Sequence, residues 1–219
     1  MLFALIFICA AFMAAFLYMD LKERHLAAVI LKGLASVCFV LMGIMNSPGG
    51  TAANYILYGL IFGCAADVVI DLRFIFKEKK KLPFMAGVVI FLLGHLAYLM
   101  AVITVSSHFV AFILAGIIPT AIVLIIMFKH ITVSPAFFTA GIVYLGVIMM
   151  LNSVSIGNLI ASPSRFTAVF AVGAFLFMIS DIVLIINNFG RKYRKGCKVA
   201  NIIMYYTGQV LIASSLLFL

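Results

Sequence analysis

The sequence has few charged residues and very few acidic ones. Of its 219 residues, 10% are charged and only six are Asp or Glu, whereas 67% are hydrophobic. A soluble domain is about 25% charged and roughly 45–50% apolar. No water-soluble fold of this size could bury so much apolar surface, so lipid must be the solvent for most of the chain. Because no hydrophilic block is long enough to form a second domain, we predict a single integral membrane domain over residues 1–219.

The sequence also lacks cysteine motifs and a signal peptide. Its four cysteines form no CxxC pair and no Cys/His cluster, so neither a disulfide framework nor a metal site is expected, and no cofactor is predicted. Two or three carboxylates could still hold a divalent ion, and that alternative stays open. No basic segment precedes the first apolar run, which is therefore interpreted as a retained span.

Eight apolar runs are long enough to cross a bilayer, for which a helix needs about 20 residues. The runs are continuous and lack the alternation of an outer-membrane barrel, so they predict helices rather than strands. The predicted fold is therefore all-α, a polytopic membrane protein with eight transmembrane helices. The predicted spans are 2–19, 25–45, 52–72, 83–104, 109–128, 133–152, 166–188 and 199–218.

The basic residues predict the orientation in the membrane. All of the 15 Lys and Arg residues except Lys32 and Arg165 lie in the connections after the first, third, fifth and seventh spans. The positive-inside rule places these connections in the cytoplasm and both termini outside, in the inner membrane if the protein is bacterial. Although the net charge is +9, the charges lie in short loops, so they indicate topology, and membrane lipids rather than nucleic acid are the predicted partners. The oligomeric state is not predicted.

Polar residues inside the predicted spans are the candidates for function, because charges are costly there and persist mainly where function or pairing requires them. Helical rise places Lys32, Asp67 and Asp181 in the cytoplasmic half, with His95 and Gln209 somewhat deeper, so one cavity could hold all five. The histidine could instead be hydrogen-bonded packing, and the tyrosines could be interfacial or interhelical contacts. The full set is Lys32, Asp67, Asp71, His95, Tyr98, Tyr144, Asp181, Asn187, Tyr205, Tyr206 and Gln209.

Simpler roles exist for the charged members of this set. Lys32 could extend its ammonium group to the inner interface. Asp71 is near the end of its span and close to Arg73, so an interfacial ion pair between them is the simpler interpretation. Asp67 and Asp181 are flanked by apolar residues well inside their spans, and a structural role for both would require a partner such as Lys32.

Two carboxyl groups in a cavity of low dielectric constant cannot both ionise easily, so one would act as a general acid and the other as an anion. Such a pair suits a reaction with an oxocarbenium-like transition state, as in glycoside hydrolysis. It would equally suit proton-coupled transport. The spacing of the residues does not choose between these functions.

A short internal repeat is also visible. Segment 66–70 resembles segment 180–184, each has an aspartate at its second position, and each is followed by a basic connection and an apolar run. His95 follows the first aspartate by the same number of residues as Gln209 follows the second. The pattern is consistent with two parallel four-helix repeats, although a match this short could also arise by chance.

Five motifs together resemble the YhhN-like lysoplasmalogenase family of eight-helix membrane proteins. The resemblance extends from about residue 32 to residue 209. Where the family has Lys-Pro, Gly-Asp, Ala-His and Ala-Gln, this chain keeps the polar residue and replaces the small or turn residue beside it. The motifs are 32–33, 66–67, 94–98, 173–181 and 205–213.

The resemblance implies hydrolysis of the vinyl ether bond of a lysoplasmalogen, which releases a fatty aldehyde and a glycerophospho-headgroup. Asp67 and Asp181 would be the catalytic acid and the anion or base, in an order that the sequence does not give. Lys32 would bind the phosphate or tune an aspartate, and a lysophospholipid substrate could enter from the inner leaflet. The residues expected to bind substrate or position water are Lys32, Asp71, His95, Tyr98, Tyr205 and Gln209.

Two functions of other classes remain open. One is a proton-coupled transporter or lipid carrier that uses the same aspartates, which would form no product without an imposed gradient. The other is a structural or assembly protein in which the aspartates only pair with Lys32. In that case, replacing the aspartates with asparagine would lower stability and spare any activity.

Overall fold

The computed structural model describes residues 2–131 and 135–219, and this part of the chain contains eight helices long and apolar enough to cross a membrane. The chain is therefore a multi-pass integral membrane protein, as the sequence predicts. The predicted start of the sixth span, residue 133, lies outside the described residues. The helices are α1 (Leu2–Leu21), α2 (His25–Asn46), α3 (Thr51–Asp71), α4 (Lys81–Thr104), α5 (Phe109–His130), α6 (Pro135–Ala161), α7 (Arg165–Phe189) and α8 (Lys195–Ser215), with 3-10 turns η1 (Leu72–Phe74), η2 (Lys77–Lys79) and η3 (Leu216–Phe218).

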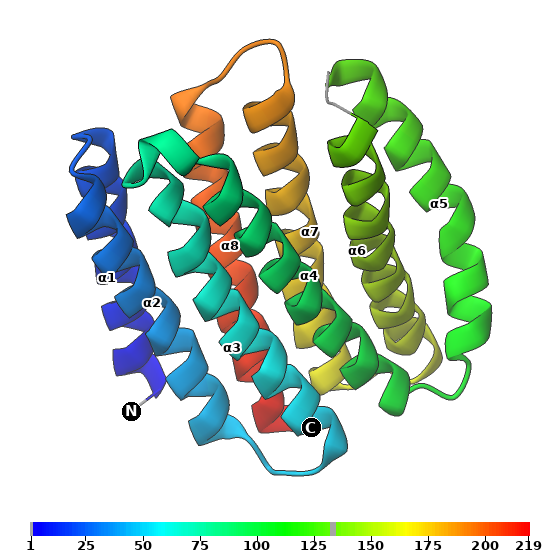
Figure 1. Ribbon diagram of the computed structural model, residues 1–219. Coiled ribbons are helices and arrows are strands. Elements are labelled where there is room, and N and C mark those ends of the chain that lie inside the picture. The colour runs from blue at the N-terminus through cyan, green and yellow to red at the C-terminus, as the bar shows by residue number, and fades with distance from the viewer. Residues whose placement is uncertain (1, 132–134) are drawn as a thin grey trace.

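The basic segments lie at one end of the helical bundle. The α1–α2, α3–α4 and α7–α8 connections are together at the upper end of Figure 1, and α5 ends there near Lys129. Both described ends of the chain lie at the opposite end of the bundle (Figure 1). This arrangement agrees with the alternation of charge along the sequence, while the side of the membrane that the basic end faces stays a prediction.

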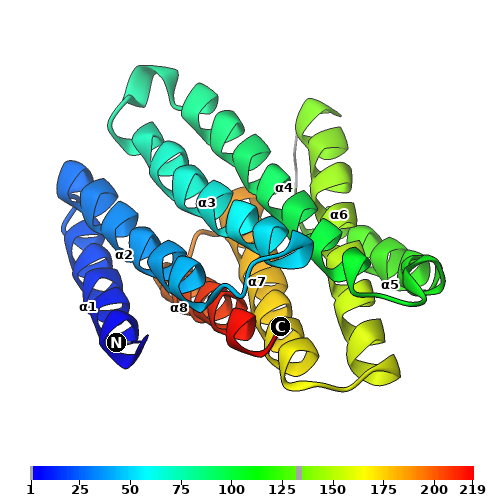
Figure 2. The ribbon, with the colours of Figure 1, turned by 90° about the horizontal axis from the view of Figure 1, so that it is seen from below.

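The helices pack as two related sets of four. The closest pairings are α3 with α4 and α7 with α8. In the first set α2 packs against α3 and α1 packs against α2, and in the second set α6 packs against α7 and α5 packs against α6. The contacts between the two sets are also equivalent. The last helix of each set packs against the second helix of the other, α4 against α6 and α8 against α2. In the view along the bundle, α1 and α5 lie at opposite edges (Figure 2). The pairing pattern supports the parallel repeat suggested by the sequence.

Two glycine crossings repeat in the same way. An added Cβ at Gly94 in α4 would lie 3.3 Å from the carbonyl oxygen of Gly59 in α3, and one at Gly208 in α8 would lie 2.8 Å from that of Gly173 in α7. The same number of residues separates Gly59 from Gly173 and Gly94 from Gly208, and also Asp67 from Asp181. Small residues let helix backbones approach closely in membranes. The two crossings therefore fix the helices that carry the two aspartates.

The predicted end of the sixth span at residue 152 is wrong, because α6 continues to Ala161. Several polar residues from residue 152 onward look like loop residues in the sequence. In the structure, their side chains form hydrogen bonds with backbone carbonyl groups within the bundle. Asn152 and Ser155 donate to carbonyls one turn earlier in α6, and Asn158 donates to the carbonyl of Val102 in α4 at 2.9 Å. Their polarity is therefore satisfied without a break in the helix.

Replacing Gly208 with alanine tests the tighter crossing. The new methyl group would meet backbone atoms of α7, which cannot rotate away, so we expect Gly208→Ala to destabilise the protein by about 1–3 kcal/mol. The matched control is Gly146→Ala in α6, where an added Cβ meets nothing within 4 Å. The thermal unfolding midpoint in detergent should fall for Gly208→Ala and stay level or rise for Gly146→Ala. Equal midpoints would contradict the close approach.

Candidate active site

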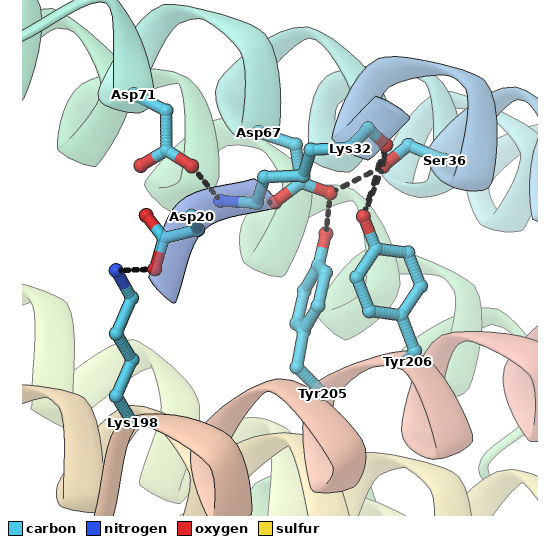
Figure 3. Close-up of polar contacts among 8 residues, drawn as sticks. All are labelled: Asp20, Lys32, Ser36, Asp67, Asp71, Lys198, Tyr205 and Tyr206. Carbon is cyan, nitrogen blue, oxygen red and sulfur yellow. Dashed lines mark hydrogen bonds and ion pairs between the residues drawn. The ribbon is translucent and has the colours of Figure 1, made fainter. Parts of the chain in front are cut away.

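Lys32 is buried among the helices and pairs with two carboxylates. Its side chain extends from α2 toward α3, where Nζ lies 3.3 Å from Oδ1 of Asp67 and 3.0 Å from Oδ2 of Asp71 (Figure 3). The residue is only 5% exposed. Lys32 therefore does not extend to the interface, and Asp71 forms its ion pair with Lys32 rather than with Arg73. Asp67 and Asp71 are one turn apart on α3, which lets a single ammonium group pair with both and leaves one net negative charge on the three side chains.

Asp67 accepts hydrogen bonds from two further helices. Ser36 of α2 donates to its Oδ2 at 2.6 Å, and Tyr205 of α8 donates to the same oxygen at 2.7 Å (Figure 3). Behind Tyr205, Gln209 donates to the tyrosine hydroxyl at 3.3 Å and accepts from Tyr98 of α4 at 2.6 Å. Every donor in this chain points toward Asp67, so the network suits a carboxylate anion.

Asp181 has different partners. Tyr144 of α6 donates to its Oδ2 at 2.9 Å, and Nε2 of His95 of α4 lies 3.3 Å from the same oxygen without the alignment of a hydrogen bond. On the other side of the ring, Nδ1 of His95 lies 2.8 Å from the carbonyl oxygen of Phe91. A carbonyl only accepts, so Nδ1 donates in this contact, and Nε2 faces the Asp181 carboxyl group. At this distance the His95 ring and the Asp181 carboxyl group are close enough to exchange a proton.

The two aspartates occupy equivalent places with opposite chemistry. Each contacts the preceding helix of its own set of four, α2 or α6, and the last helix of the other set, α8 or α4. Asp67 has a lysine partner, whereas among the described residues no Lys or Arg pairs with Asp181. A purely structural pairing of both aspartates with Lys32 is therefore wrong for Asp181.

One cavity of about 650 Å³ connects the two aspartates. Asp67, Asp71 and Asp181 all line it, together with Lys32 and several aromatic and aliphatic side chains. The cavity extends to the basic end of the bundle. Its lining there includes Arg73, Lys80, Lys81, Tyr193 and Lys198, and its apolar part includes Val88, Phe91, Phe128, Gly141, Leu145 and Ile185.

The residues proposed from the sequence fall into two groups. Lys32, Asp71 and Tyr205 line the cavity beside the aspartates, whereas His95, Tyr98 and Gln209 lie behind the lining. Gln209 donates to Tyr205 in the lining, Tyr98 donates to Gln209, and His95 lies 3.3 Å from Asp181. Ser36 was not among the candidates from the sequence, and Tyr144 was a candidate to which no role was assigned. Ser36 lies one turn after Lys32, on the same helical face, and that spacing is a signal that could have identified it.

The donor set in the described part of the chain contains no group of three or more His, Cys, Asp or Glu arranged to hold a metal ion. The two carboxylates that are one turn apart already share the ammonium group of Lys32. Asp181 lies beside a histidine and a tyrosine.

Comparison with known protein families identifies the family of the chain. Residues 26–216, which include every residue of the site, match the YhhN family. The chain belongs to the YhhN family. No curated protein and no solved structure matches the chain. In this YhhN-family chain, the matched region begins in α2 before Lys32 and ends after Gln209, as the motifs in the sequence predict.

Replacing Lys32 tests whether it neutralises the buried carboxylates. Lys32→Met would leave Asp67 and Asp71 without a cation, and breaking a buried pair on one side costs about 3–5 kcal/mol. We expect a large fall in the thermal unfolding midpoint. Lys129→Met, at an exposed lysine, should change it little. If both substitutions have similarly small effects, the ion pairs are not important for stability.

Proposed function

We propose that the protein hydrolyses the vinyl ether bond of lysoplasmalogen-type lysophospholipids, giving a fatty aldehyde and a glycerophospho-headgroup. The observation that carries the proposal is the pair of buried carboxyl groups, Asp67 and Asp181, on one cavity with opposite surroundings. Asp67 is paired with a lysine, whereas Asp181 lies beside a histidine with which it could exchange a proton. Vinyl ether hydrolysis requires both an anion and an acid, but no covalent nucleophile.

The first step is protonation of carbon. The proton held between His95 and Asp181 passes from the Asp181 carboxyl group to the vinyl carbon farther from the ether oxygen, which leaves an oxocarbenium ion. Asp181 is the member of the couple that lines the cavity, so His95 acts from behind as its positioning residue and proton partner. Tyr144 donates to the same carboxyl oxygen and holds its orientation.

Asp67 completes the reaction. Its negative charge, kept in place by Lys32, Ser36 and Tyr205, stabilises the oxocarbenium ion and accepts a proton from the attacking water. Water adds to the carbon that carries the ether oxygen and forms a hemiacetal. The hemiacetal collapses to the aldehyde as Asp67 gives its new proton to the departing glycerol oxygen, and the hemiacetal hydroxyl group returns a proton to Asp181. The overall balance is one water consumed for one ether bond broken.

The shape of the cavity fits a single-chain lipid. Its apolar lining reaches toward α5 and α6, where side chains such as Phe128 and Leu145 could contact the alkenyl chain, and its other end is lined by basic residues. A substrate with one chain and one anionic headgroup matches this polarity.

Aldehyde release tests the proposal. The purified protein in detergent should release aldehyde from a vinyl-ether lysophosphatidylethanolamine and not from its saturated-ether analogue, with or without EDTA. Asp67→Asn and Asp181→Asn should each lower the rate by at least about 10²–10⁴-fold, the usual contribution of a positioned acid or base. Glu78→Gln, at an exposed carboxylate outside the cavity, is the matched control and should retain the wild-type rate.

The alternative of a proton-coupled carrier is favoured by the two related four-helix sets with acidic groups between them. A carrier forms no product. If folded wild-type protein releases no aldehyde from this or related lysolipids, the enzyme proposal fails, and proton-dependent lipid movement in vesicles becomes the next measurement.

A further inference from the structure

Arg73 is a half-buried cation at the cavity, and none of the ion pairs among the described residues includes it. It lies in η1 directly after α3 and lines the cavity at its basic end. Its guanidinium carbon is 4.7 Å from the ring centre of Phe74 and 4.9 Å from that of Phe84, so two aromatic rings hold the group. Its Nε is buried and has no hydrogen-bond partner among the residues that the structure describes.

The acids near Arg73 already have partners. Asp71 and Asp20 are close enough to interact with Arg73 electrostatically. Asp71 forms its ion pair with Lys32, and Asp20 forms one with Lys198 of α8 (Figure 3). Among the described residues, no ion pair involves the Arg73 guanidinium. A guanidinium that is held in place without a carboxylate is suited to bind an anionic ligand, and its fork of donors fits phosphate oxygens.

The position of Arg73 fits a phosphate rather than the reacting bond. Lys32 lies deeper, and its charge is already shared by Asp67 and Asp71, so it is not available to a phosphate. Arg73 is six positions after Asp67, which is about 9 Å along a helix. In a lysophospholipid, the glycerol carbons and a phosphoester oxygen separate the sn-1 ether oxygen from the phosphorus, which is a separation of similar order.

We propose that Arg73, held between Phe74 and Phe84, binds the headgroup phosphate of the lysophospholipid and makes the site selective for phospholipids over neutral ether lipids. The proposal rests on the proposed function in that the cavity accepts an ether lysolipid. Lys80, Lys81 and Lys198 line the same end of the cavity and add positive potential around the phosphate. This assigns phosphate recognition to Arg73 instead of Lys32.

Binding of lipids that cannot be hydrolysed tests this assignment separately from catalysis. The ligands are a saturated 1-O-alkyl lysophosphatidylethanolamine and the 1-O-alkylglycerol of the same chain length, titrated into the purified full chain. Wild type should bind the phospholipid more tightly. Arg73→Gln should weaken phospholipid binding by about tenfold to a hundredfold, the usual range for a hydrogen bond to a charged group, and leave binding of the neutral lipid unchanged. Arg191→Gln, at an exposed arginine outside the cavity, should change neither.

Other outcomes overturn the assignment. If Arg73→Gln weakens both lipids equally, Arg73 only supports the fold, and if it weakens neither, the phosphate binds elsewhere. If inorganic phosphate alone binds as tightly as the phospholipid, the site takes a free anion rather than a lipid headgroup. Should Arg73→Gln fail to fold, Arg73→Lys decides, because it keeps the charge but loses the fork and should lose most of the preference for phospholipid. Since the saturated ether is not cleaved, failure of hydrolysis would leave these results intact.

Discussion

The ion pair between Lys32 and Asp67 is the constraint around which the rest of the site is built. A lysine inside a membrane bundle requires a partner, and Asp67 and Asp71 provide it from one face of α3. The remaining oxygen of Asp67 then accepts from α2 and α8, so a single carboxylate joins three helices. This junction fixes one wall of the cavity and holds the negatively charged Asp67 carboxylate there.

The second set of four helices repeats the geometry and changes the chemistry. The residue equivalent to Lys32, at the separation that relates Asp67 to Asp181, is Gly146. Without that ammonium group, Asp181 has a histidine and a tyrosine as its partners. A duplicated arrangement thus yields two unlike carboxyl groups on one cavity, and this difference allows one to act as an anion and the other to deliver a proton.

Much of the fold could be predicted because hydropathy and charge are properties of single segments. Span number and the shared side of the basic connections follow from run length and from where Lys and Arg fall. The end of α6 was missed, because Asn152 and Ser155 look like loop residues until their bonds to helix carbonyls are seen. Contacts between helices are harder to predict, because hydropathy does not say which faces meet. The burial of Lys32, and the absence of an ion pair to Arg73 among the described residues, therefore appear only in three dimensions.

The origin of the proton and of the oxygen in the products tests the central claim most directly. The reaction of a vinyl-ether lysolipid would be run in D₂O and, separately, in ¹⁸O-labelled water. The aldehyde would be trapped by reduction, and the masses of both products would be measured by mass spectrometry. Carbon protonation by the carboxyl pair predicts one deuterium on the carbon next to the aldehyde and no ¹⁸O in the glycerophospho-headgroup. An aldehyde-derived product without deuterium, or a headgroup that carries ¹⁸O, would contradict the mechanism, because the bond would then have broken on the glycerol side or without protonation at carbon.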